Sequence, residues 1–250
     1  MSLVAPLEVM SGDDPEVVLR WAFSAFPKVA IVASFQAESS VLIDMTARAG
    51  LPLHVITLDT GRLPQETHDL IDEVRDRYGI VIEVVAPDAT EVGSLTREHG
   101  VNPFYQSVEL RRLCCEIRKS RPLTRALEGF DAWVTGLRRQ QAETRSHTQV
   151  VSADSEHSGL TKIAPLAGWT RDQVWSYIRN NDVPYHSLYD RGYTSIGCAP
   201  CTRAIASGEA SRAGRWWWET NAPKECGIHC AIESGGLEHE LHAILGDAHE

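Results

Sequence analysis

Four short apolar segments, separated by longer segments with helical periodicity, limit the folds that this chain can adopt. They span residues 29–33, 53–58, 80–85 and 132–135 and contain many β-branched side chains. Strands that alternate with helices in this way form a parallel sheet covered on both faces. The sequence therefore predicts an α/β fold with a mainly parallel sheet flanked by helices.

The segments between the strands carry signals for helix ends. Asp14, which is followed by a proline, is typical of an N-cap before a first helical turn. Gly50 and Gly79 suit the left-handed position that follows many helices. Thr170 and Gln173 have the spacing of a capping box, which predicts a helix that continues to about residue 180.

Other parts of the chain are less regular. No clear period is present between residues 85 and 132, and the polar stretch 150–161 predicts an exposed hairpin or loop. No internal repeat or low-complexity tract occurs. The 250 residues can bury a sizeable core, as one large domain or two small ones.

Composition and charge exclude several classes of function. No apolar run could span a bilayer and no secretion signal is present, so we predict a cytoplasmic protein without a membrane partner. A net charge of −10 argues against non-specific binding of nucleic acid. Arginines nevertheless cluster at residues 111–112, 138–139 and 212–215. This combination indicates a specific small anion as the ligand.

Polar turns follow the predicted strands at the edge where parallel sheets bind ligands. Residues 34–40 lead into a helix N-terminus, where backbone N–H groups and serine hydroxyls can hold an anion. Residues 136–145 form an arginine-rich loop, and arginine pairs with phosphate or sulfate through two parallel hydrogen bonds. The alternatives are a plain serine N-cap for the first turn and a solvated loop for the second.

Cysteine spacing gives the strongest local chemical signal. The six cysteines are Cys114, Cys115, Cys198, Cys201, Cys226 and Cys230. In a reducing cytoplasm, such a set is more typical of metal binding or catalysis than of disulfides. The first four thiolates could hold a [4Fe–4S] cluster or a tetrahedral zinc ion. Two adjacent cysteines would strain the backbone around one small ion, which favours the cluster; unrelated buried cysteines are the remaining alternative.

Positive charges accompany two of these cysteine groups. Lys119 follows the first pair and could bridge a negatively charged cluster and a bound anion; the alternative is a solvated lysine. Cys226 lies between Lys224 and His229. A nearby cation favours the thiolate, which is the nucleophilic form. The pattern predicts a reactive thiol at Cys226, with an ordinary buried cysteine as the alternative.

Six stretches, in a characteristic order, carry a family resemblance. They are Leu58-Asp-Thr-Gly61, Cys114-Cys115-Glu-Ile-Arg-Lys119, Gly136-Leu-Arg-Arg-Gln140, Ser195-Ile-Gly-Cys198-Ala-Pro-Cys201-Thr202, Arg212-Ala-Gly-Arg215-Trp-Trp-Trp-Glu219 and Lys224-Glu-Cys226-Gly-Ile-His229. With them, the chain resembles the assimilatory adenylylsulfate reductases of the sulfonucleotide reductase family. The resemblance covers residues 29 to 229.

The resemblance implies a fold and a reaction. The expected fold is a twisted parallel sheet of the adenine nucleotide α-hydrolase type. Cys226 is expected to attack the sulfur of adenosine 5′-phosphosulfate, so that AMP leaves and an S-sulfocysteine remains. Thioredoxin would then release sulfite, which is the step that feeds sulfate assimilation and cysteine biosynthesis. The cluster would have a structural or electrostatic role, not one in electron transfer.

The resemblance also implies residue roles and an assembly. The expected substrate contacts are Ser34, Ser39, Leu58, Lys119, Gly136, Arg212 and Arg215. Cys114, Cys115, Cys198 and Cys201 would hold a [4Fe–4S] cluster. Residues 1–205 would form the nucleotide-binding domain with the iron–sulfur site, and residues 206–250 a flexible catalytic segment. A homo-oligomer is expected.

Alternative functions remain open at this point. A related reductase could act on the 3′-phosphorylated nucleotide, although family members for that substrate generally lack the two cysteine pairs. An ATP-dependent thiolation or adenylation enzyme would need a glycine-rich loop, and residues 34–39 lack its glycines and aspartate. A non-enzymatic iron–sulfur carrier would not need Cys226. Cys230 is either a resolving thiol or a spare cysteine.

Overall fold

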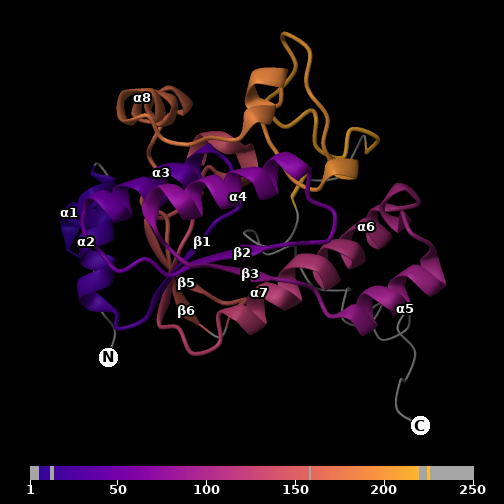
Figure 1. Cartoon of the computed structure of the whole chain (residues 1–250), viewed down its shortest axis with the longest axis horizontal. Helices are drawn as coiled ribbons and strands as arrows, with labels where there is room; N and C mark the ends of the chain where they lie inside the picture. The colour runs from indigo at the N-terminus through magenta and orange to yellow at the C-terminus, as the bar shows by residue number, and fades with distance from the viewer. Residues whose placement is uncertain (1–5, 12–13, 158, 220–223, 226–250) are drawn as a thin grey trace.

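Six strands form one sheet between layers of helices (Figure 1). The computed structural model describes residues 6–11, 14–157, 159–219 and 224–225. The strands are β1 (Val29–Val32), β2 (Val55–Leu58), β3 (Ile82–Val85), β4 (Ala132–Val134), β5 (Val151–Asp154) and β6 (Leu160–Ile163). Their order is β3-β2-β1-β4-β6-β5, and only the β5–β6 pair is antiparallel. The prediction of a mainly parallel sheet is confirmed.

Helices of several kinds connect the strands. The α-helices are α1 (Leu7–Ser11), α2 (Pro15–Ala25), α3 (Ala37–Arg48), α4 (Gln65–Tyr78), α5 (Ala89–His99), α6 (Val108–Cys115), α7 (Arg121–Ala126) and α8 (Arg171–Asn181). A π-helix, η2 (Glu116–Ser120), joins α6 to α7. Short 3₁₀ segments are η1 (Pro103–Tyr105), η3 (Arg139–Gln141), η4 (Glu143–Arg145), η5 (Ser187–Arg191) and η6 (Ala199–Cys201).

Side chains of the central strands alternate between two apolar layers. Ile31 of β1 belongs to a large core that also contains residues of α2, α3, α4 and α8. Its neighbour Ala30 lies in a second core with Leu123 of α7 and Trp133 of β4. Because both faces are buried, the strands consist of nearly continuous apolar residues.

The predicted helix-end signals are present in the structure. Asp14 Oδ1 accepts a hydrogen bond from the N–H of the second residue of α2 at 2.9 Å. Gly50 and Gly79 have φ angles of 66° and 61°, in the left-handed region that glycine adopts without strain. Gln173 N donates to Thr170 Oγ1 at 3.2 Å, and Thr170 N donates to Gln173 Oε1 at 2.8 Å. These contacts confirm the capping box, and α8 ends at Asn181.

Helix α3 begins earlier than the apolar pattern predicts. It starts at Ala37, so Ser39 and Ser40 lie in its first turns and are buried. The N-cap residue is Gln36, and no side chain caps it. The alternative of a plain serine N-cap is therefore wrong. The apolar pattern missed this helix start because the first turns carry polar side chains that are nevertheless buried, namely Glu38, Ser39 and Ser40.

The stretch between β3 and β4 is more regular than predicted. It contains α5, α6, the π-helix η2 and α7. Three of its cationic side chains, Arg111, Arg118 and Lys119, are at most 9% exposed. Buried cations on these helices disrupt the apolar period, and this explains why the sequence pattern missed them. Single π-helical turns within helices are frequent at functional sites.

The polar stretch after residue 150 was predicted to be an exposed hairpin or an exposed loop. It forms a hairpin, but Asp154 and His157 within it are buried. Strands β5 and β6 pair antiparallel, but β6 also pairs in parallel with β4 and so extends the sheet. Asp154 Oδ2 accepts hydrogen bonds from Trp133 Nε1 at 2.9 Å and lies 2.8 Å from His157 Nδ1. These buried contacts attach the hairpin to the core.

Residues on either side of the predicted domain boundary at 205 are paired. Thr202 and Arg215 form an antiparallel bridge, and Trp216 N donates to Cys201 O at 3.2 Å. The division into residues 1–205 and 206–250 stays a prediction. Among the described residues, no helix is long and apolar enough to cross a membrane.

Candidate active site

A cavity with about 990 Å³ of empty space lies at the carboxyl ends of β1, β2 and β4. The strand order reverses between β1 and β4, which is the topological switch point where open α/β sheets bind ligands. All of the predicted substrate contacts line this cavity; they are Ser34, Ser39, Leu58, Lys119, Gly136, Arg212 and Arg215. The structure thus brings together residues from distant parts of the chain, while their roles stay predictions.

The turn between β1 and α3 presents two serine hydroxyls to the cavity. Ser34 N donates to Ser39 Oγ at 3.0 Å, and the two hydroxyl oxygens lie 3.4 Å apart. Between them, Phe35 is fully buried and has a φ angle of 53°. The left-handed region costs a non-glycine residue roughly 1–2 kcal/mol. Burial of the Phe35 ring in the core offsets this cost and holds the turn in place.

Gly136 allows the end of β4 to approach the first turn of α3. A Cβ atom at Gly136 would lie 2.8 Å from Glu38 Cβ, closer than real side chains come. Glu38 in turn forms a buried ion pair with Arg138, with 2.7 Å between Oε1 and Nη2. Arg138 of the predicted anion-binding loop is therefore committed to a carboxylate. Arg145, at the other end of that loop, lines the cavity instead.

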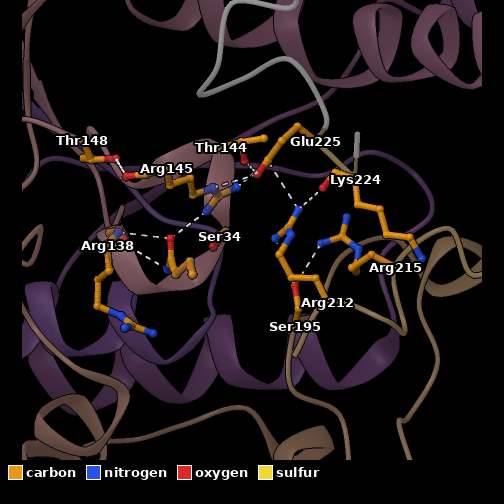
Figure 2. A network of polar contacts seen from close by, with 12 residues as sticks. Ser34, Arg138, Thr144, Arg145, Thr148, Ser195, Arg212, Arg215, Lys224 and Glu225 are labelled. Atoms are coloured by element: carbon orange, nitrogen blue, oxygen red, sulfur yellow. Dashed lines mark hydrogen bonds and ion pairs between the residues drawn. The ribbon is translucent and has the colours of Figure 1, made fainter. Parts of the chain in front are cut away.

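Cations from three segments line the cavity and are called the cationic wall here: Lys119, Arg145, Arg212 and Arg215. Figure 2 shows the three arginines. Lys119 comes from η2, Arg145 from η4, and Arg212 and Arg215 from the segment after η6. Arg215 Nη1 donates to Ser195 Oγ and to Ile196 O, each at 3.4 Å, and its guanidinium lies 4.6 Å from the centre of the Trp216 ring. These contacts orient Arg215, so the cavity has a preformed cationic wall that suits an anion.

Thr67 and His186 form a buried pair that the sequence analysis did not single out. Thr67 lines the cavity, and its hydroxyl lies 2.9 Å from His186 Nε2. His186 Nδ1 accepts from Leu188 N at 3.3 Å, so Nε2 carries the proton. Burial lowers the pKa of His186 to about 4, which keeps the ring neutral. Nothing in the sequence around His186 indicates that it would be buried and bonded to Thr67 beside the cavity.

Four cysteines line a second, small cavity that shares Lys119 with the first. Cys114, Cys115, Cys198 and Cys201 are each 8% exposed and form no disulfide. Lys119 lines both cavities. Thr60 Oγ1 lies 3.3 Å from Cys198 Sγ.

Four thiols and no carboxylate or imidazole are among the residues that line this cavity, a donor set that both a [4Fe–4S] cluster and a zinc ion use. Burial raises the pKa of Cys201 to about 12, and it also raises the pKa of Cys114. Four thiolates there require compensation by metal cations. Among the described residues, no three His, Cys, Asp or Glu side chains are grouped closely enough to hold a metal ion as they stand. The choice between a cluster and zinc stays a prediction.

The predicted nucleophile Cys226 and the second tail thiol Cys230 lie outside the described residues, as does His229. The two residues directly before Cys226, Lys224 and Glu225, are described and contact the cationic wall.

A mainly parallel sheet with a cation-lined cavity at its switch point is the architecture of α/β proteins that bind nucleotides. Residues 28–204 match the model of the phosphoadenosine phosphosulfate reductase domain. Relatives named adenosine 5′-phosphosulfate reductase are 50% identical in Burkholderia cepacia, over 81% of this chain and 80% of that one, and 49% identical in Allochromatium vinosum, over 80% and 78%. The chain belongs to the phosphoadenosine phosphosulfate reductase domain family.

Solved structures agree with this assignment. The phosphoadenylyl-sulfate reductase of Candida auris, in a phosphate complex, has a TM-score of 0.66 and 30% identity, over 80% of this chain and 98% of that one. The FMN adenylyltransferase of Candida glabrata has a TM-score of 0.57 at 15% identity, over 99% and 87%. The second likeness shows the fold alone, and it agrees with the expected mainly parallel sheet flanked by helices.

Proposed function

We propose that this protein reduces adenosine 5′-phosphosulfate to sulfite and AMP through an S-sulfocysteine on Cys226, with thioredoxin as the reductant. The observation that carries the proposal is the convergence of Lys119, Arg212 and Arg215 on the cavity at the sheet's switch point. The names of the relatives at 43–50% identity support the same substrate. A cytoplasmic location and a homo-oligomeric state are further parts of the proposal.

The cavity can divide the nucleotide between two environments. Backbone at the ends of β2 and β4, near Leu58 and Gly136, would take the adenosine, and the serine turn would take the phosphate. The cationic wall would bind the phosphate and sulfate oxygens. Cations at this position reduce the repulsion between an incoming thiolate and an anionic sulfate, and they stabilise the charge that moves to the leaving group.

The reaction follows from this arrangement in two displacements. The Cys226 thiolate attacks the sulfate sulfur; an S–S bond forms, the S–O bond to the phosphate breaks, and its electron pair leaves with AMP. A thiolate of reduced thioredoxin then attacks Cys226 Sγ and displaces sulfite. The second thioredoxin thiol resolves the mixed disulfide and regenerates the Cys226 thiol. Two electrons from the dithiol thus reduce sulfate to sulfite.

Cys114, Cys115, Cys198 and Cys201 would hold a [4Fe–4S] cluster beside this cavity, and we propose that the cluster supplies structural and electrostatic support. Lys119 would act on the substrate side, because it borders both cavities. Arg118 Nη1 donates to Thr60 O at 2.7 Å, which connects the cysteine-bearing segment to the end of β2.

The 3′-phosphorylated nucleotide is the second candidate substrate. The likeness to the Candida auris phosphoadenylyl-sulfate reductase, at 30% identity, favours it. The more similar relatives, at 43–50% identity, are named for the nucleotide without the 3′-phosphate, and we therefore place that substrate first. Comparing kcat/KM for the two nucleotides separates the candidates.

The proposed reaction is tested by mass spectrometry of the full protein after incubation with adenosine 5′-phosphosulfate and no reductant. We expect one SO₃ group per active site, located on the peptide that contains Cys226, with an equivalent amount of AMP released. Thioredoxin should then remove the group as sulfite. An adduct on another cysteine, or AMP release without any adduct, would contradict the proposal.

Substitution of Gly197 should separate ligand binding from stability. A Cβ atom at this position would lie 2.5 Å from Arg215 Nη2 and 2.7 Å from its Cζ. Because the guanidinium ends a flexible side chain, Gly197→Ala should displace it without unfolding the protein. A charge-assisted hydrogen bond contributes roughly 1.5–3 kcal/mol, so we expect affinity for adenosine 5′-phosphosulfate to fall at least about tenfold.

Calorimetry in a Cys226→Ser background measures this affinity without turnover. The matched control is Gly93→Ala on α5, where a Cβ atom would have nothing within 4 Å. Unchanged affinity in Gly197→Ala would show that Arg215 does not bind the substrate.

A further inference from the structure

The Glu225 carboxylate lies on two of the arginines that line the substrate cavity (Figure 2). Glu225 Oε1 accepts from Arg145 Nε at 3.0 Å and from Thr144 Oγ1 at 2.9 Å. Its Oε2 accepts from Arg145 Nη2 at 2.6 Å and from Arg212 Nη2 at 3.3 Å. The contact with Arg145 is the two-bond pairing that arginine also forms with phosphate or sulfate.

Glu225 is buried and charged in this position. It is 5% exposed, and Arg145 is 8% exposed. Burial alone would raise the pKa of Glu225, but the hydrogen bond from Arg145 and the charge of Arg212 outweigh burial and hold the pKa below its ordinary value. An ion pair in such a place is weakly screened by water and salt.

The backbone around Glu225 is held as well. Arg111 Nη1 donates to Glu225 O at 2.8 Å, and Arg212 Nη2 donates to Lys224 O. Arg111 is itself fixed by two hydrogen bonds to Glu219, at 3.0 and 2.9 Å. These contacts seat the carboxylate on the cationic wall from several directions.

Each of the three guanidinium nitrogens of Arg145 already makes a hydrogen bond in this arrangement. Nε and Nη2 bind Glu225, and Nη1 donates to Gln141 Oε1 at 2.6 Å. An anion in the cavity can therefore gain the side-on two-bond pairing with Nε and Nη2 of Arg145 only if the Glu225 carboxylate leaves. The same holds in part for Arg212, whose Nη2 is shared between Glu225 and the carbonyl of Lys224.

We propose that Glu225 is an internal competitor for the substrate's anionic group: in the ligand-free protein its carboxylate occupies the Arg145–Arg212 pair, and an anion that binds this pair displaces it. The proposal rests on the proposed function for the identity of that anion. Its physical consequence is that Glu225 lowers the affinity of the cavity for anions while its charge offsets that of the buried Arg145–Arg212 pair.

The test compares the full-length protein with Glu225→Gln, in a Cys226→Ser background, by calorimetry at low ionic strength. The amide keeps the shape of the side chain but removes its charge. We expect adenosine 5′-phosphosulfate to bind about three- to tenfold more tightly to the Gln variant. Neutral adenosine should bind both proteins equally. An equal or lower affinity for the anionic nucleotide would overturn the proposal.

Inorganic sulfate serves as a second probe, so that a wrong nucleotide assignment does not obscure the result. If neither nucleotide binds, the proposed function fails, whereas tighter sulfate binding in Glu225→Gln still supports the competitor. Unchanged sulfate and nucleotide affinity overturns the competitor alone.

Two further variants control for charge and folding. Glu209→Gln removes the same charge from a carboxylate that Arg203 binds at 2.8 and 2.9 Å, outside the residues that line the cavity, and should leave anion affinity unchanged. Thr144→Val removes one hydrogen bond from Glu225 and should also raise anion affinity, by a smaller factor than Glu225→Gln does. A rise in Glu209→Gln equal to that in Glu225→Gln would contradict a local competition.

Discussion

Replacement of Cys226 with serine is expected to lower sulfite release by at least about 1000-fold. A hydroxyl is a far weaker nucleophile than a thiolate at neutral pH, and the serine variant cannot form the S–S bond of the intermediate. The loss should appear in turnover with adenosine 5′-phosphosulfate and reduced thioredoxin, measured both as sulfite and as AMP. Iron content and the brown absorbance should stay at the level of the unmodified protein.

Cys230→Ser is the matched control, because it exchanges the same atoms four residues further along the chain. If Cys230 is a spare cysteine, its variant keeps full turnover. If it is a resolving thiol, the variant still forms the adduct on Cys226 but releases sulfite more slowly. Loss of colour in Cys226→Ser would make Cys226 a metal ligand, and continued AMP formation would assign the nucleophile elsewhere.

The sheet could be predicted because its strands obey simple rules. Segments such as 29–33 and 132–135 are apolar and β-branched on both faces, and helices with clear end signals separate them. The carboxyl-end turns then had to share one edge, since parallel strands all point the same way. This is why the turns after segments 29–33, 53–58 and 132–135 could be expected at one edge of the sheet, while Ser34, Leu58 and Gly136 themselves came from the family resemblance.

Buried charge limited prediction elsewhere. Arg111 is 1% exposed in α6, and its partners Glu219 and Glu225 are more than 100 residues away in the chain. Sequence patterns place charged residues on the surface, so a helix with a buried arginine does not show the expected apolar period. The early start of α3 was missed for the same reason, because Glu38 pairs with Arg138 across the cavity edge.

The arginines near the cavity show which features the sequence alone reveals and which need the structure. Arginines at 138, 145, 212 and 215 were all visible as clusters in the sequence. Only the structure separates Arg138, which is tied to Glu38, from Arg145, which lines the cavity and pairs with Glu225. The distinction depends on contacts between residues about 80–100 positions apart, which spacing cannot encode.

Cys198→Ser is expected to remove iron from the protein and to lower its thermal stability. Cys198 lies in a buried cluster with the other three cysteines, and it contacts Thr60 at the end of β2. The free energy of metal binding contributes to folding, because the unfolded chain lacks the assembled site. A loss of about 3 kcal/mol would lower Tm by roughly 6–12 °C in a domain of this size.

Metal analysis of the anaerobically purified variant, together with a thermal unfolding curve, measures both effects. Cys230→Ser again provides the control and should retain its iron and its Tm. Four irons per chain in the unmodified protein, lost in Cys198→Ser, would support a [4Fe–4S] cluster, whereas one zinc per chain would contradict it.

Turnover should also fall in Cys198→Ser. Lys119 lines both the cysteine cavity and the substrate cavity, so a collapse of the cysteine cavity would displace this cation from the substrate cavity. Retention of full turnover without iron would show that the cationic wall is held by the protein alone.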